Sequence, residues 1–72
     1  MGILVLKTNI HDTLAKRRIQ PVFDNHPEIR AWTVDIDDED KVLRIEASDN
    51  LSYDEVIQVV SGQDLYCEEL TN

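Results

Sequence analysis

The side chains best suited to chemistry lie in a short polar stretch after the first apolar run, where Asn9, His11 and Asp12 occur together. An imidazole nitrogen and a carboxylate oxygen can bind Zn²⁺, but a closed zinc site normally needs about four ligands. The missing ligands would have to come from His26 or Cys67, which are far away in the sequence. The competing interpretation is a capped helix start beside an exposed histidine, and we favour it. His11 and Asp12 are candidate metal ligands, and we expect neither a metal ion nor a cofactor.

Cys67 is the single cysteine of the chain. One cysteine excludes an intramolecular disulfide and a Cys-x-x-Cys site, and it is typical of a reducing compartment, so we expect a cytoplasmic protein. The neighbouring carboxylates of Glu68 and Glu69 should raise the pKa of the thiol and make it unreactive. We therefore predict a small buried side chain on the last strand.

The acidic run at residues 35–40, together with Glu46, places carboxylates at four positions of a calcium-binding loop. Such a loop needs glycine at its sixth position, which is Asp40 here, and helices on both sides, where this chain shows strand patterns. We interpret the run as a solvated hairpin turn. A surface cation site at this turn is the alternative.

Catalytic residue types are present without a catalytic arrangement. The chain has Ser48, Ser52 and Ser61, two histidines and many carboxylates. It has no nucleophile-base-orienter spacing and no glycine-rich phosphate loop, and Ser52 is already explained as a helix cap. We do not expect an enzyme.

The net charge of −8 is distributed unevenly along the 72 residues. Residues 1–34 carry five basic and three acidic side chains, whereas residues 35–72 carry two basic and twelve acidic ones. Such a surface repels phosphate backbones, so no nucleic-acid partner is expected. The first apolar run, residues 3–6, is too short to span a membrane or to form the core of a signal peptide, so no membrane partner is expected.

The elements that must position these groups centre on residues 28–47. Trp32, Val34 and Ile36 alternate with polar residues, and after an acidic turn at 37–40 a second alternation sets Leu43 and Ile45 against charged residues. This pattern predicts a hairpin of two strands, 28–36 and 41–47, with one apolar and one polar face.

The remaining chain predicts two helices and two further strands. Residues 2–8 indicate a central strand buried on both faces. A helix should begin at Asp12 or Thr13 and finish near Asn25, with a kink at Pro21. A second helix should run from Ser52, which forms a capping box with Glu55, to Gly62, and a last strand should cover 65–70.

The order β-α-β-β-α-β predicts an α+β, ferredoxin-like βαββαβ sandwich. Two helices would cover one face of a four-stranded antiparallel sheet in one domain, residues 1–72. The other face would stay open. Its expected lining residues are Thr33, Asp35, Val42, Arg44 and Glu46.

Several segments resemble heavy-metal-associated (HMA-like, copper-chaperone-like) domains. They are the opening strand, the spacing of Ile19 and Phe23, the run from Ile29 to Ile36, the start of the second helix and the closing segment 65–70. That family holds a soft metal ion with Cys-x-x-Cys in the loop before the first helix. This chain has Asp12-Thr13-Leu14-Ala15 or Asn9-Ile10-His11-Asp12 there, depending on the alignment. The resemblance implies the fold, in a degenerate member that lacks the metal motif.

Two functional hypotheses follow. The first is a small non-enzymatic binding module that has lost its soft-metal ligands and contacts a protein partner, or itself, through the open sheet face or an edge strand. The alternative is residual binding or trafficking of Zn or Cu through His11 and Asp12, with further ligands from a partner.

Overall fold

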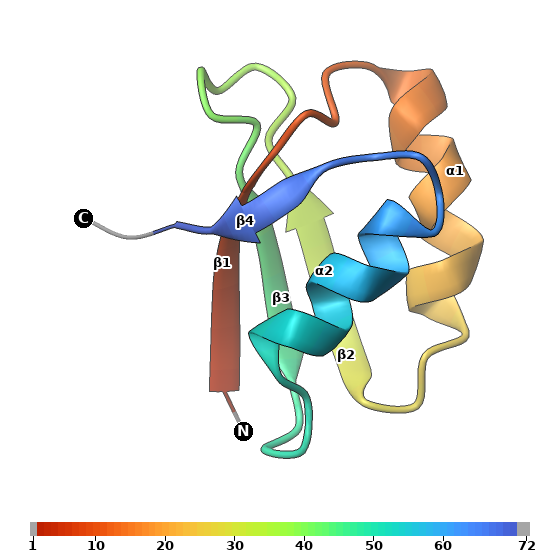
Figure 1. The fold of residues 1–72 in the computed structure, drawn as a ribbon, viewed down its shortest axis with the longest axis vertical. Coiled ribbons are helices and arrows are strands. Elements are labelled where there is room, and N and C mark those ends of the chain that lie inside the picture. Colours follow the sequence, from red (N-terminus) through yellow and green to blue (C-terminus); the bar gives the residue numbers. More distant parts are fainter. Residues whose placement is uncertain (1, 71–72) are drawn as a thin grey trace.

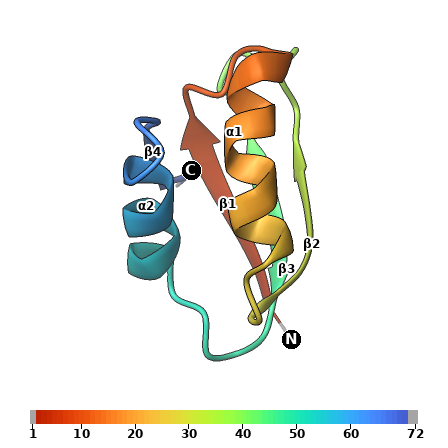
Figure 2. The ribbon, with the colours of Figure 1, turned by 90° about the vertical axis from the view of Figure 1, so that its right-hand side faces the viewer.

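The computed structural model describes residues 2–70 and has four strands and two helices. In chain order they are β1 (Gly2–Thr8), α1 (Thr13–Asp24), β2 (Ile29–Val34), β3 (Leu43–Ala47), α2 (Tyr53–Ser61) and β4 (Cys67–Glu69). The strands form one sheet of order β2-β3-β1-β4, in which every neighbouring pair is antiparallel. Both helices lie on one side of this sheet (Figures 1 and 2). The predicted ferredoxin-like βαββαβ fold is confirmed.

The strand register separates a core face from an open face. On the core face, Leu4 of β1 lies opposite Ile45 of β3, and Ile45 lies opposite Trp32 of β2. On the open face, Ile3 lies opposite Glu46. Ile3 is 55% exposed. The prediction that β1 is buried on both faces is therefore wrong, because both helices pack on the same side and nothing in the described chain covers the other.

Helix α1 begins where its capping residue was predicted. The Asp12 carboxylate accepts a hydrogen bond from the Ala15 amide (2.8 Å), and one face of the helix buries Ala15, Ile19 and Phe23. The helix continues through Pro21 to Asp24. A kink at Pro21 stays a prediction.

Helix α2 uses half of the expected capping box. The Ser52 hydroxyl accepts a hydrogen bond from the Glu55 amide (3.2 Å). The Glu55 carboxylate lies 3.1 Å from Nε2 of His26, so this side chain contacts the α1–β2 connection. Gly62 ends the helix at an ordinary helical φ of −62°, and the left-handed conformation falls on Asp64 instead (φ 64°).

Three strands are shorter than predicted. Regular pairing in β2 and β3 stops at Val34 and Leu43 because the chain turns between them, with Lys41 at a left-handed φ of 48°. β4 covers only Cys67–Glu69 because Asp64 and Leu65 still bond back to the end of α2. Across residues 2–70, no helix has the length and apolar character needed to cross a membrane.

Candidate functional site

The loop between β1 and α1, residues 9–12, is fastened to the end of β4. The Asn9 amide donates to the Tyr66 carbonyl (3.1 Å), and the Tyr66 amide donates to the Asn9 side-chain oxygen (2.8 Å). Ile10 is fully buried. The side-chain oxygen of Asn9 is therefore already engaged by the backbone, which leaves it poorly placed to bind an ion.

Thr8 connects this loop to the acidic hairpin turn. Its buried hydroxyl donates to the Lys41 carbonyl (2.5 Å) and accepts from the Ile10 amide (3.1 Å). Its own amide donates to the Asp40 carbonyl (3.1 Å). One side chain thus positions both loops at this end of the molecule.

Replacing Thr8 by valine should lower the free energy of unfolding by about 1–3 kcal/mol. The substitution keeps the shape of the side chain but leaves the Ile10 amide and the Lys41 carbonyl without their partner in a buried setting. Urea unfolding followed by Trp32 fluorescence measures the change. The control is Thr33→Val, which alters the same atoms at an exposed position. Equal stability of the two variants would contradict the bridging role of Thr8.

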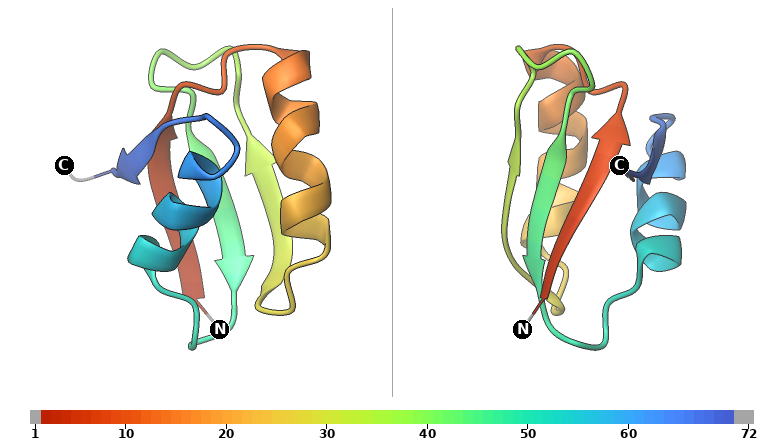
Figure 3. Two further views of the ribbon diagram at one scale, coloured as in Figure 1. Left: turned by 45° about the vertical axis from the view of Figure 1, so that its right-hand side comes forward. Right: turned by 90° about the vertical axis from the view of Figure 1, so that its left-hand side faces the viewer.

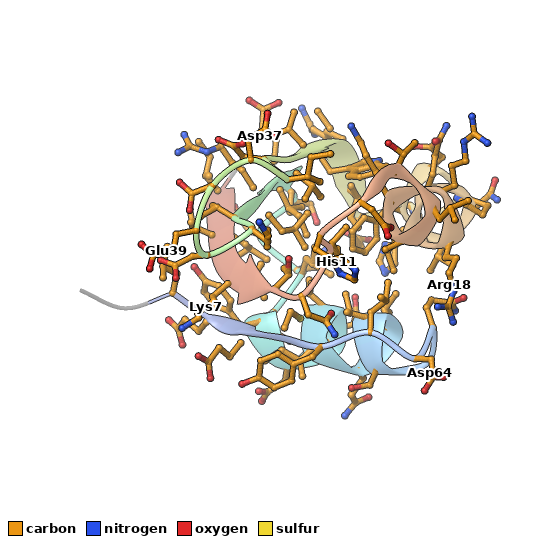
Figure 4. The ribbon with its side chains drawn as sticks, turned by 90° about the horizontal axis from the view of Figure 1, so that it is seen from above. Lys7, His11, Arg18, Asp37, Glu39 and Asp64 are labelled. Atoms are coloured by element: carbon orange, nitrogen blue, oxygen red, sulfur yellow. The ribbon has the colours of Figure 1, made fainter. Side chains whose placement is uncertain are left out.

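His11 and Asp12 do lie beside each other, and both are exposed. Nε2 of His11 is 3.5 Å from the Asp12 carboxylate, and Nδ1 of His11 is 2.9 Å from the Asn9 carbonyl. The other oxygen of Asp12 caps α1. Figure 4 shows His11 apart from Asp37 and Glu39 of the acidic turn, and no group of three possible ligands forms among residues 2–70. Two ligands at most are available here.

The two outside ligands considered from the sequence are engaged elsewhere. Nδ1 of His26 accepts the Glu28 amide (3.1 Å), and Nε2 of His26 pairs with Glu55. Cys67 lies opposite Thr8 in the sheet and is only 4% exposed. Within residues 2–70, no three His, Cys, Asp or Glu side chains gather as a metal site requires.

Burial raises the pKa of the Cys67 thiol from its ordinary value of 9.0 to about 11. The direction agrees with the prediction, but the cause is different. We expected Glu68 and Glu69 to act, whereas the thiol of Cys67 lies in the core, and desolvation there raises its pKa.

The acidic turn at residues 35–40 is closed by its own hydrogen bonds. The Asp35 carboxylate accepts from the Asp37 amide (3.2 Å), and the Asp38 carboxylate accepts from the Asp40 amide (2.8 Å). Asp40 also lies 3.7 Å from the Lys7 ammonium group. This arrangement is that of a solvated turn.

The open face brings together all five residues predicted for it. Thr33 lies opposite Arg44, and the Asp35 amide donates to the Val42 carbonyl (2.9 Å). Val42 is half-buried, and the other four are exposed. Their side chains border two shallow hollows of about 180 and 300 Å³. The figures show no helix over this face (Figure 3).

The sequence interpretation missed the part of the open face that β1 contributes, and it did not list Ala31 of β2. Ile3 and Val5 lie opposite Glu46 and Arg44, and Ala31 lies opposite Glu46 on the other side. The run from Ile3 to Leu6 shows no alternation, and that is why these residues were placed in the core. The polar Lys7, two positions after Val5, was the available signal for an exposed face.

The chain was compared with known proteins at the level of sequence and of structure. No protein-family model matches the sequence, and the search of curated proteins finds no match. Solved structures do match. A protein from work on crosstalk between Cu(I) and Zn(II) homeostasis superposes with a TM-score of 0.82 at 10% identity, covering 97% of this chain and 100% of the other.

The yeast copper transporter domain Ccc2a, solved in apo and Cu(I)-loaded states, superposes with a TM-score of 0.82 at 8% identity, over 97% of this chain and 96% of the domain. The structure of the Atx1-Cu(I)-Ccc2a complex matches with a TM-score of 0.81 at 8% identity, over 96% and 94% of the two chains. At such low identity the likeness concerns the backbone alone. The chain has the ferredoxin-like fold of these copper-transport domains.

Proposed function

We propose that this chain is a small, non-enzymatic protein-interaction module, built on the fold of copper-transport domains but without their use of a soft metal ion. It would be a degenerate HMA-like domain that works through its open sheet face. The buried free cysteine fits a reducing, cytoplasmic setting.

The observation that carries the proposal is the chemistry of residues 8–15. Soft ions such as Cu(I) select thiolate or thioether ligands. This loop contains neither, its Asn9 oxygen and one Asp12 oxygen are held by backbone amides, and its histidine is exposed. The nearest strand offers one thiol, at Cys67, and burial keeps that thiol protonated at neutral pH. The residues present do not fit a Cu(I) ion.

Protein interaction is supported by the fold and by the surface. Ccc2a shares the fold and is seen in a complex with Atx1. In this chain the open face carries charged side chains beside the exposed Ile3 and the half-buried Val5, a mixture typical of protein contact surfaces.

A second candidate function is metal handling through His11 and Asp12 with ligands from a partner. The observation in its favour is that Nε2 of His11 lies 3.5 Å from the Asp12 carboxylate on an exposed surface. Two ligands give weak binding alone, and a partner chain would have to complete the site.

Titration of the reduced protein with Cu(I) and then Zn(II), followed by amide-correlation NMR, tests both candidates. For the interaction module we expect no stoichiometric Cu(I) binding and no shifts confined to residues 9–15, because no thiolate is available there. His26 and its neighbours provide an internal control, since Glu28 and Glu55 already occupy both ring nitrogens.

The His11→Ala variant separates the two candidates further. Zinc-dependent shifts at residues 9–15 that disappear in this variant would favour metal handling. Stoichiometric Cu(I) binding that survives in it would contradict both candidates, because the ligands would then lie elsewhere in the chain.

A further inference from the structure

The open face carries two parallel rows of side chains that are complementary in charge. One row crosses the sheet through Ile3, Glu46 and Ala31, and the next crosses it through Val5, Arg44 and Thr33. Residues two apart on one strand are separated by roughly 6.5–7 Å. Each row therefore has one apolar residue on β1 and one charge on β3, and the two charges are opposite.

Both charges lack a partner among the residues that the structure describes. Among residues 2–70, neither Arg44 nor Glu46 takes part in an ion pair or a side-chain hydrogen bond. The two side chains flank the shallow hollow of about 180 Å³ that lies over Ala31 and Thr33. The centre of this face is thus electrically neutral in a chain whose net charge is −8.

We propose that this face pairs with the same face of a second copy of the chain. The dyad would run across the strands between the two rows, over Ile45. This rotation places the row through Glu46 in one copy opposite the row through Arg44 in the other copy. Arg44 then faces Glu46 of the second copy, twice by symmetry, and Ile3 faces Val5 of the second copy.

The register excludes the other simple two-fold pairing. A dyad parallel to the strands and centred on β3 would place Arg44 opposite Arg44 of the second copy and Glu46 opposite Glu46 of the second copy. Both contacts are between like charges and repel. A dyad across the strands turns both contacts into attractions. The neutral centre also matters because two chains of charge −8 repel each other over most of their surface.

The size of the face sets the expected strength of the dimer. β1 has seven residues, and at about 3.3 Å per residue and 4.8 Å between strands the neighbouring strands β2, β3 and β1 present a patch of roughly 20 by 15 Å. That is smaller than the roughly 800 Å² per partner of a standard interface. We expect a weak dimer, so the measurement has to extend from micromolar to millimolar protein.

The experiment is sedimentation equilibrium of the chain over that range, with charge variants on the face. Arg44→Glu should weaken the dimer by about tenfold or more, because it places carboxylates opposite carboxylates at both symmetric contacts. Glu46→Arg should do the same with two cations. The matched control is Arg17→Glu. It makes the same change of charge as Arg44→Glu at an exposed position of α1, away from the open face, and should leave assembly unchanged.

Mixing the two single variants provides the decisive arm. Arg44→Glu leaves two carboxylates at the centre of the face, and Glu46→Arg leaves two cations there. Each variant alone should be monomeric. A mixture of the two variants restores both attractions, so it should form a heterodimer. Isotope-filtered NMR on a mixture of labelled and unlabelled chain should show contacts between Ile3 methyls and Val5 methyls of different copies.

A chain that stays monomeric up to millimolar concentration would overturn the inference, and so would a dimer that Arg44→Glu leaves intact or that Arg17→Glu weakens equally. The inference rests on the proposed function, but the two fail separately. Cu(I) binding contradicts the interaction module whatever the assembly state. A chain that stays monomeric and binds no Cu(I) would overturn the dimer but not the interaction module, whose partner would then be a different protein.

Discussion

Replacing Phe23 by alanine should lower the free energy of unfolding by about 3–5 kcal/mol, the largest effect expected of any single substitution here. Phe23 is 1% exposed and is the largest of the fully buried side chains. Its ring meets Trp32 edge to face, with ring centroids 5.3 Å apart, and so joins α1 to β2. The substitution removes this contact and leaves a cavity between helix and sheet.

A loss of that size would remove a large part of the stability of the domain. Domains are stable by roughly 0.05–0.15 kcal/mol per residue, which for 72 residues is on the order of 4–11 kcal/mol. Urea unfolding followed by the fluorescence of Trp32 measures the change. Leu14→Ala is the control, because Leu14 lies on the same helix but is 70% exposed. A cost below about 1 kcal/mol for Phe23→Ala would contradict the described core.

Raising the pH from 9 to 11 should destabilise the fold by on the order of 2–3 kcal/mol through Cys67. Burial raises the pKa of this thiol to about 11 in the folded chain, against 9.0 for an ordinary cysteine. Between these values the unfolded chain has lost the thiol proton while the folded chain still holds it. The stabilisation is fully present below pH 9 and is lost as the pH rises towards 11, at about 1.4 kcal/mol per pKa unit.

The free energy of unfolding, measured by urea titration at a series of pH values, reports this dependence. The Cys67→Ala variant should be less stable at neutral pH and should lose less stability between pH 9 and 11. The hydrogen bond from Tyr66 to Glu68 raises the pKa of the Tyr66 phenol, and Tyr66→Phe removes any contribution of this group to the alkaline pH dependence. An unchanged pH slope in Cys67→Ala would show that the thiol is not the responsible group.

Thiol modification provides a second measurement on Cys67. Two pKa units correspond to about a hundredfold smaller thiolate fraction near neutral pH, and burial hinders access as well. An alkylating reagent should therefore react with the folded protein at least about a hundredfold more slowly than with the chain in urea. Equal rates would mean that Cys67 is open to solvent.

Features that depend on neighbouring residues were predictable from the amino-acid sequence. Period-two alternation placed the two strands of the hairpin, and the buried spacing of Ile19 and Phe23 identified α1. Asp12 and Ser52 could be recognised as caps because a cap bonds to an amide only three residues away. From these elements and their order the ferredoxin-like topology followed, since few arrangements satisfy the handedness of the crossovers.

Contacts between distant residues were not predictable in this way. The sequence suggested a capping role for the Glu55 carboxylate, but in the fold it meets His26, and Thr8 binds the carbonyl of Lys41, 33 residues away. The burial of Cys67, rather than its acidic neighbours, determines its pKa. Such effects depend on which segments the fold packs together, and no local pattern records that.

The open face illustrates the same division. Alternation in the hairpin was enough to predict that Thr33, Arg44 and Glu46 share a polar face. Only the register of β1 against β3 brought Ile3 and Val5 into the same rows, because four consecutive apolar residues carry no periodicity that separates one face from the other. The sequence by itself determined the elements, their order and the absence of a thiol from the loop before α1. The tertiary structure decided which side chains line the open face, since strand pairing joins residues about 40 positions apart.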